Sequence, residues 1–123
     1  MSQFHESDPV VDRKSKFQGR AVKLSTQDQI PTILNQLLED KKIRKSSHPH
    51  IYAWRLANSQ GYNDNGEKGA GTRLLENALV RNGVVGALVI VTRWMGRGSI
   101  GPARFRHIVS VGIDSLKKGG FIK

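Results

Sequence analysis

The chain has 123 residues, which is enough for one domain with one hydrophobic core but too short for two. It contains no cysteine, so disulfides and thiolate chemistry are excluded, and a metal site would have to use histidine and carboxylate ligands. The chain has twenty Lys and Arg residues and ten Asp and Glu residues, which gives a net charge of +10. Such a charge favours partners such as RNA, a ribosome or an acidic protein face, and it also serves solubility.

The chain begins with a polar segment. Residues 1–12 predict a flexible leader and lack the apolar stretch of a secretory signal. No apolar run approaches the roughly 20 residues that a membrane span needs. We expect a soluble, cytoplasmic protein that makes no membrane contact, in which residues 13–123 form a single domain. No motif indicates a cofactor.

A strand and a helix follow this segment. Alternating apolar residues over 13–24 predict the strand, with Gly19 at a bulge. Segment 26–45 has the period of an amphipathic helix. Its apolar stripe, spaced at i, i+3, i+4, i+7 and i+8, consists of Ile30, Ile33, Leu34, Leu37 and Leu38.

The two ends of this helix carry separate signals. Pro31 must lie in the first turn, so Asp28 is predicted as the N-cap in preference to Thr26. Four of the five residues Lys41–Lys45 are cations, which complement the negative end of the helix dipole. We favour that explanation over a ligand patch.

A second strand and a long loop occupy the middle of the chain. Residues 51–57 alternate and predict a strand with Tyr52, Trp54 and Leu56 on one face. The polar, glycine-rich segment 58–71 is longer than most loops, and such loops are usually functional or disordered. A further strand is expected either in the first half of this loop or in the leader.

The last part of the chain predicts helix, strand and helix. One helix runs from about Thr72 to Gly83, the β-branched run 84–94 predicts a central strand, and a final helix runs from about Pro102 to Gly119. The side chains expected to face the core are Leu74, Leu75, Ala78, Leu79, Phe105, Ile108, Val109, Ile113 and Leu116. This order of elements argues for a sheet with helices packed on it.

The segment Gly66–Arg73 is a near match to a phosphate-binding loop. Backbone N–H groups that glycines leave accessible, followed by the N-terminus of a helix, are well placed to bind an anion. However, Thr72 and Arg73 stand where that loop needs Lys followed by Ser or Thr. We therefore reject a nucleotide-hydrolysing loop and keep an anion site at the helix start as an alternative.

Asp64 and Glu67 place two carboxylates close together. Such pairs serve acid–base chemistry or bind a hard cation, but the other ligands of a calcium loop are absent from this spacing. Asn65 and Gly66 form a strong turn signal by themselves. We favour a structural role, in which Glu67 complements the dipole of the following helix.

Three histidines are candidates for metal ligands. His48, His50 and His107 could form a trio, but they have no fixed helical spacing and no cysteine beside them. Histidines in surface turns are the commoner case. The sequence therefore predicts no metal site.

The strand end and basic loop after residue 92 form the best candidate surface. The cations of the last 31 residues are Arg93, Arg97, Arg104, Arg106, Lys117, Lys118 and Lys123. Arginine suits bidentate recognition of phosphate or carboxylate, and Trp94 could stack on a base. The alternative is that Trp94 belongs to the core and the arginines form a solvated face.

These motifs together resemble the Impact family, whose bacterial and eukaryotic members include the YigZ-like proteins, with a form closer to fungal members. The match covers nearly all of residues 13–118. The segments that carry it are Lys14–Phe17, Lys42–Ile43, Ser47–Pro49, Ala53–Arg55, Asp64–Glu67, Ala70–Arg73, Val89–Trp94 and Ile100–His107.

The resemblance implies an α+β two-layer sandwich, with a mixed sheet of about four strands, as in a small-subunit ribosomal protein domain and domain IV of the ribosomal translocase. It also implies a role around translation. Eukaryotic relatives restrain the amino-acid-starvation kinase that phosphorylates an initiation factor, by competing for its ribosome-associated activator. Those relatives carry a separate N-terminal domain that binds the activator. We therefore expect this chain to share the fold and the loop surface of the family more readily than its kinase-restraining role.

Two positions depart from the family pattern: Asn65 replaces an acidic residue, and Arg97 stands where a glycine usually follows Gly96. The leading hypothesis is a non-enzymatic binding module in translation or its stress control, with RNA, a ribosome or an acidic protein as partner. Its expected surface comprises His48, Asp64, Glu67, Arg73, Arg93, Trp94, Arg97, Arg104, Arg106 and His107. The alternative is an enzyme in which Glu67 is the acid–base and Arg73 and Arg93 hold an anionic substrate.

Overall fold

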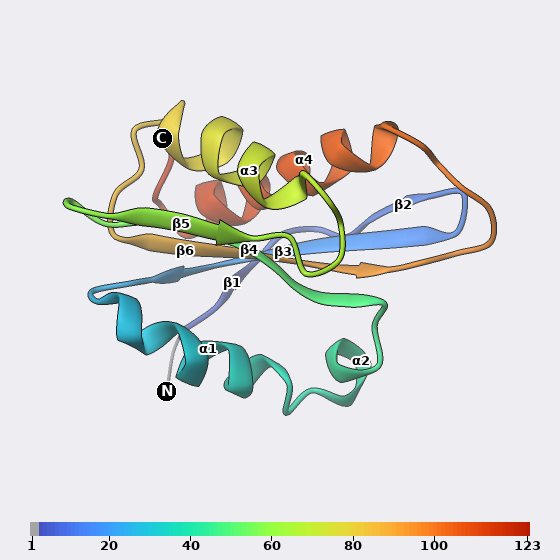
Figure 1. The fold of residues 1–123 in the computed structure, drawn as a ribbon, viewed down its shortest axis with the longest axis horizontal. Helices are drawn as coiled ribbons and strands as arrows, with labels where there is room; N and C mark the ends of the chain where they lie inside the picture. Colours follow the sequence, from blue (N-terminus) through green and yellow to red (C-terminus); the bar gives the residue numbers. More distant parts are fainter. Residues whose placement is uncertain (1–2) are drawn as a thin grey trace.

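A six-stranded antiparallel sheet lies between two layers of helices in the computed structural model, which describes residues 3–123 (Figure 1). The strand order is β1-β3-β6-β4-β5, and β2 also pairs with β3. The α+β class is confirmed. The finer expectation of two layers and a mixed sheet of about four strands is corrected, because every strand pair is antiparallel and helices pack on both faces.

The elements have the following bounds. The strands are β1 (His5–Glu6), β2 (Val10–Asp12), β3 (Ser15–Lys23), β4 (His48–Arg55), β5 (Gln60–Asn63) and β6 (Ala87–Trp94). The helices are the 3-10 turn η1 (Gln27–Gln29), α1 (Ile30–Leu37), α2 (Lys41–Arg44), α3 (Ala70–Leu74), the π-helical η2 (Leu75–Val80) and α4 (Ala103–Lys118). No helix among these described residues is long and apolar enough to cross a bilayer.

The expected flexible leader 1–12 is wrong for the part that the structure describes. β1 and β2 both pair with β3, with His5 opposite Ala21 and Val10 opposite Phe17. Between them, the buried Ser7 hydroxyl accepts a hydrogen bond from Gly19 N–H at 2.8 Å. The alternative that a further strand lies in the leader is therefore confirmed, although each strand is too short for its bounds to show as an alternating pattern. The further strand expected in the long loop is β5.

Gly19 does not form the expected bulge. β3 pairs with β6 in unbroken register, with Gly19 opposite Val91. The glycine instead allows α4 to cross the sheet closely, because a Cβ at this position would collide with the backbone carbonyl of Val111. The absence of a side chain at residue 19 therefore sets the distance between β3 and α4.

The helix expected over 26–45 is divided into three short elements. Thr26 precedes η1, and its N–H donates to the Gln29 side chain at 3.3 Å, so Asp28 is not the N-cap of α1. Pro31 lies in the first turn of α1, as predicted. The chain then breaks, and α2 restarts behind Asp40, whose carboxylate accepts the Lys42 N–H at 2.8 Å.

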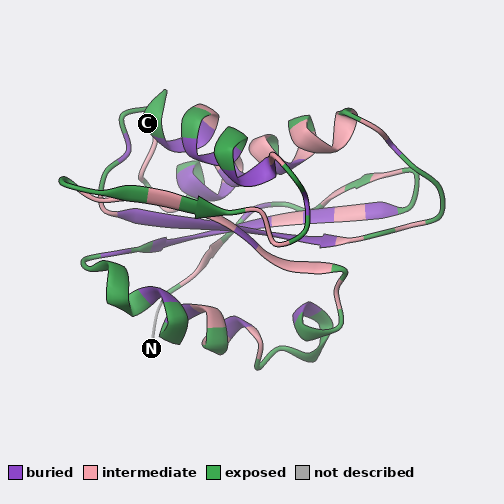
Figure 2. Ribbon diagram, in the orientation of Figure 1, coloured by how far each residue is buried: buried purple, intermediate pink, exposed green. Residues whose placement is uncertain are grey.

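β6 lies at the centre of the sheet and separates two apolar cores. Seven of its eight residues are buried, which is typical of a strand covered on both faces. Figure 2 shows buried positions along the middle of the sheet and exposed positions on the outer faces of the helices. One core lies between the sheet and the helices α1 and α2. The other lies on the opposite face, between the sheet and α3, η2 and α4.

The inward face of α4 is narrower than the sequence predicts. Its buried residues are Ile108, Val111, Gly112, Ser115 and Leu116. Three apolar residues that were expected to be in the core are only partly buried and lie at its margin: Phe105, Val109 and Ile113. α4 therefore carries a second apolar stripe beside the one that packs on the sheet.

Candidate functional site

Glu67 is the centre of a buried cluster of charged groups, which we call the Glu67 cluster. The residue is only 7% exposed, and its Oε2 accepts a hydrogen bond from Arg93 Nη1. Its Oε1 lies 3.5 Å from Arg104 Nε and 4.0 Å from His48 Nε2. The cluster joins the 64–69 loop, β6, α4 and β4, so four segments that are distant in sequence meet at one carboxylate.

Arg93 is buried rather than presented at the surface. It is 3% exposed, and its guanidinium lies 5.3 Å from the centre of the Phe17 ring on the neighbouring strand. Its Nη2 also contacts the buried Ser15 hydroxyl at 3.4 Å. An arginine this deep requires a paired carboxylate, and Glu67 supplies it. The expected role of Arg93 in a surface contact is therefore wrong.

The expected anion site at the start of α3 is already occupied by Asp64. Its carboxylate accepts N–H groups from Gly69 at 3.1 Å and from Gly71 at 2.7 Å. Asn65 adopts a left-handed conformation, and its carbonyl accepts a hydrogen bond from His48 Nδ1 at 2.8 Å. The loop is thus held by its own polar groups, which supports a structural role for Asp64.

Several expected surface residues serve structural contacts. Trp94 is half-buried at the edge of the core next to α1, and its Nε1 donates to Lys42 O at 2.9 Å, so it lies between the core and the surface alternatives. His107 Nε2 lies 2.7 Å from the Asp12 carboxylate. Arg73 and Arg104 both stack on the Phe105 ring, at 4.0 and 4.2 Å from its centre.

Three of the expected cations remain exposed and apart from the Glu67 cluster: Arg73 in α3, Arg97 in the loop after β6, and Arg106 on α4. His107 bonds Asp12 and packs 5.2 Å from the Phe17 ring, whereas His48 bonds the 64–69 loop. The described residues contain no group of three or more His, Cys, Asp or Glu side chains that could hold a metal ion.

A second charged surface, which we call the basic end, lies where β3 begins and β6 ends. Its exposed or half-exposed cations are Arg13, Lys14, Lys16, Lys41, Lys42, Lys45 and Arg97. Three contacts bring their segments together: Lys16 pairs with Trp94, Trp94 Nε1 bonds Lys42 O, and Gly96 fits directly against the Lys14 backbone. Arg13 lies 3.9 Å from Asp12, but among residues 3–123 the other six cations form no ion pair.

The long helix expected to end at Lys41–Lys45 is replaced by α1 and the single-turn α2. Lys41, Lys42 and Arg44 lie in the last turn of α2, and Arg44 Nη1 donates to Leu38 O at the end of α1 at 3.0 Å. Cations therefore still lie at helix C-terminal ends, as expected, and the lysines are also part of the basic end. Sequence analysis missed the surface because it is assembled by strand pairing between residues nearly 80 positions apart.

The enzyme alternative is only partly compatible with this geometry. Glu67 and Arg93 are in contact, as that alternative requires. Both are almost fully buried, however, and Arg73 bonds Gly69 O and stacks on Phe105 instead of joining them. A cavity of about 850 Å³ lies between η2 and α4, and it is lined by Arg73 but not by Glu67 or Arg93.

His50 gives the fold a pH-dependent stability. Burial lowers its pKa from the usual 6.5, and this outweighs an opposing contribution from the Leu34 backbone. Because the folded state then binds a proton less readily than the unfolded state, stability should fall as the pH falls below 6.5. We expect His50→Gln to reduce this slope by at most about 1.4 kcal/mol per pH unit, measured by urea unfolding from pH 7.5 to 5. An unchanged slope would contradict this expectation.

Comparison with known proteins identifies a matching family. A family model described as the Impact N-terminal domain matches residues 13–116. An IMPACT family member of Saccharomyces cerevisiae is 38% identical, over 97% of this chain and 93% of that protein. A Protein IMPACT homolog of the same yeast is 36% identical over 94% of this chain but only 46% of its own length. The human Protein IMPACT is 38% identical, over 81% of this chain and 32% of its own.

Solved structures agree with this match. The two-domain translational regulator Yih1 aligns with a TM-score of 0.62 and 34% identity, over 94% of this chain and 46% of the Yih1 chain. A hypothetical protein of 19% identity aligns with a TM-score of 0.70 over 95% of this chain and 57% of its own, and shows the fold alone. This chain therefore corresponds to about half of each of these two solved chains.

Proposed function

The chain belongs to the Impact N-terminal domain family, and from that membership we propose that it is a non-enzymatic binding module of translation control. In this proposal, the basic end binds the phosphates of RNA, on the ribosome or on free RNA. The observation that carries the proposal is the gathering of seven cations from three separate segments on one surface. Yih1, which shares this fold at 34% identity, is a translational regulator, and this likeness supports the translational setting.

The chemistry of the basic end favours phosphate over a single anionic metabolite. Its cations are spread over the β2–β3 turn, α2 and the loop after β6, so they match a chain of phosphates and not one compact charge. Six of the seven have no ion-pair partner among the described residues, so binding need not break existing pairs. Trp94 helps to hold this surface together, because its Nε1 bonds Lys42 O and Lys16 Nζ lies 4.9 Å from the centre of its ring.

Salt-dependent binding tests this proposal. The probe is a labelled single-stranded RNA, measured by fluorescence anisotropy, with co-sedimentation of purified ribosomes as a second measurement. A basic-end variant combines Lys42→Ala, Lys45→Ala and Arg97→Ala. We expect its affinity for RNA to fall about 10-fold or more near 0.1 M salt, and the slope of log K against log salt to become shallower by about 2, since each lost phosphate contact contributes about 0.7.

The control variant combines Lys23→Ala, Lys68→Ala and Lys123→Ala, which removes the same charge from exposed positions outside the basic end. We expect it to bind RNA within about twofold of the unmodified chain. Equal losses in the two variants would show a general charge effect and contradict a site at the basic end. Binding that does not depend on salt would contradict phosphate recognition altogether.

A further inference from the structure

A groove with an apolar floor runs between η2 and α4, on the face of the molecule that carries the upper helices in Figure 1. Its volume is about 850 Å³. The floor includes Phe105, Val109 and Ile113, which are spaced at i, i+4 and i+8 on α4 and are only partly buried. They form the second apolar stripe of α4, which the sequence assigns to the core but which the structure leaves only partly buried.

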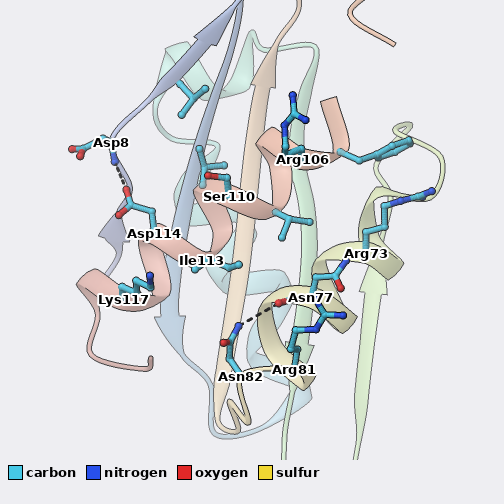
Figure 3. A pocket seen from close by; sticks show the side chains of 14 residues that line it. Asp8, Arg73, Asn77, Arg81, Asn82, Arg106, Ser110, Ile113, Asp114 and Lys117 are labelled. Atoms are coloured by element: carbon cyan, nitrogen blue, oxygen red, sulfur yellow. Dashed lines mark hydrogen bonds between the residues drawn. The ribbon is translucent and has the colours of Figure 1, made fainter. Parts of the chain in front are cut away.

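The rim of the groove is positively charged on both sides. Arg73 and Arg81 lie on the side of α3 and η2, and Arg106 and Lys117 lie on α4 (Figure 3). All four are exposed, and within residues 3–123 none of them forms an ion pair. Arg73 is already held in place by its stacking on Phe105 and its bond to Gly69 O at 3.0 Å.

The two carboxylates of the groove lining share one cation, Lys118. Asp8 and Asp114 lie together at one end, where Lys118 Nζ is 2.8 Å from the first and 3.5 Å from the second. The Asp8 N–H also donates to the Asp114 carboxylate at 2.9 Å, as the dashed line in Figure 3 marks. The lining therefore carries an excess of positive charge, because its four rim cations outnumber two carboxylates that already share Lys118.

We propose that this groove binds an acidic amphipathic helix of a protein partner. An apolar stripe of helical spacing, flanked by cations on both sides, is complementary to a helix with apolar residues on one face and carboxylates beside them. Asn77 and Ser110 add polar groups at the edges. The proposal goes beyond RNA binding at the basic end, because it concerns a different surface and a different class of partner.

The same residues argue against RNA in the groove. Single-stranded RNA is bound by stacking bases on exposed aromatic rings. Phe105 is the aromatic residue that lines the groove, and its ring already carries the guanidinium groups of Arg73 and Arg104. A base would have to displace them, whereas an aliphatic side chain needs only the free apolar edge of the stripe.

The test uses the full chain and a defined probe. The probe is a synthetic, end-capped peptide of about 18 residues with leucines at helical spacing and glutamates on both flanks. One control peptide has the same composition in scrambled order, and a second has lysine in place of glutamate. We expect the acidic helix to bind with at least 10-fold higher affinity than either control, and to shift the amide signals of Asn77, Arg81 and Ser110 in NMR spectra.

Two charge-reversal variants locate the site. Arg81→Glu with Arg106→Glu should weaken the acidic helix about 10-fold or more, whereas Lys42→Glu with Lys45→Glu at the basic end should change it less than about twofold. All four positions are exposed and form no ion pairs among the described residues, so both variants should fold, which circular dichroism checks.

Three outcomes would overturn the proposal. Equal binding of the scrambled peptide would show that no helical face is recognised, and equal losses in the two variants would show that charge acts without a site. Loss of RNA binding in the Arg81 and Arg106 variant, with the peptide unaffected, would make the groove a nucleic-acid site. If only the Lys42 and Lys45 variant loses RNA binding, the proposal for the groove is unaffected. Each of the two proposals can therefore fail without the other.

Discussion

Replacement of Glu67 by glutamine should lower the free energy of unfolding by about 3–5 kcal/mol, because it leaves the buried Arg93 without its counter-charge. The amide keeps the shape of the side chain, so the loss reports charge and not packing. The result is measured by urea unfolding at pH 7 and low salt. Glu39→Gln, at an exposed position with no ion pair among residues 3–123, should change stability by less than about 0.5 kcal/mol.

A double substitution separates the contribution of the Glu67–Arg93 ion pair to stability from the effect of leaving one of its charges unpaired. When Glu67→Leu and Arg93→Met are combined, no buried charge is left unpaired between them, so we expect most of the stability lost in Glu67→Gln to return. Arg104 then keeps its bond to Gly101 O at 2.8 Å. A double variant that is no more stable than Glu67→Gln would show that the cluster acts through loop geometry and not through charge pairing.

Gly19→Ala is the second substitution with a large expected effect. Its Cβ would collide with the Val111 carbonyl, which belongs to the backbone of α4 and cannot rotate away. Either α4 or β3 must shift, and we expect a loss of about 3 kcal/mol, at the upper end of the usual range for overpacking. Thermal and urea unfolding of the variant measure this loss.

Gly112→Ala is the matched control, since it adds the same methyl group to the same helix–sheet contact. There the added Cβ would lie 2.7 Å from Leu74 Cδ1, the end of a side chain that has other rotamers. A helical alanine also gains about 1 kcal/mol over glycine in intrinsic preference. We expect a clearly smaller loss than for Gly19→Ala. Equal losses would mean that side-chain packing, and not the backbone crossing, limits the distance between α4 and β3.

Most of the fold could be predicted from hydrophobic pattern alone. The alternation at Tyr52, Trp54 and Leu56 and the buried run in β6 are both confirmed, because a strand's period of two is visible within eight residues. A strand in the leader was one of two alternatives, but the bounds of β1 and β2 could not be predicted, since two or three residues carry no period. Their positions depend on pairing with β3, which is tertiary information.

The candidate site was harder to predict than the fold. Sequence analysis identified Glu67 and Arg93 as notable residues but placed Arg93 on the surface, because its burial depends on a carboxylate 26 residues away in the chain. It assigned Phe105, Val109 and Ile113 to the core, because helical spacing gives the width of an apolar stripe but not how much of it the sheet covers. Both errors concern which group packs against a given residue. A linear sequence pattern does not contain this information about tertiary contacts.

The position of β6 in the sheet determines when the sheet can be completed during synthesis. β3 and β4 both pair with β6 and not with each other, so the two halves of the sheet, β1-β3 and β4-β5, share no neighbour until residues 87–94 have emerged. Each half exposes an unpaired strand edge until then, and such edges invite pairing with other chains. The last strand to be made is thus the one that joins the halves, and the nascent chain gains its protection from misassembly in a single late step.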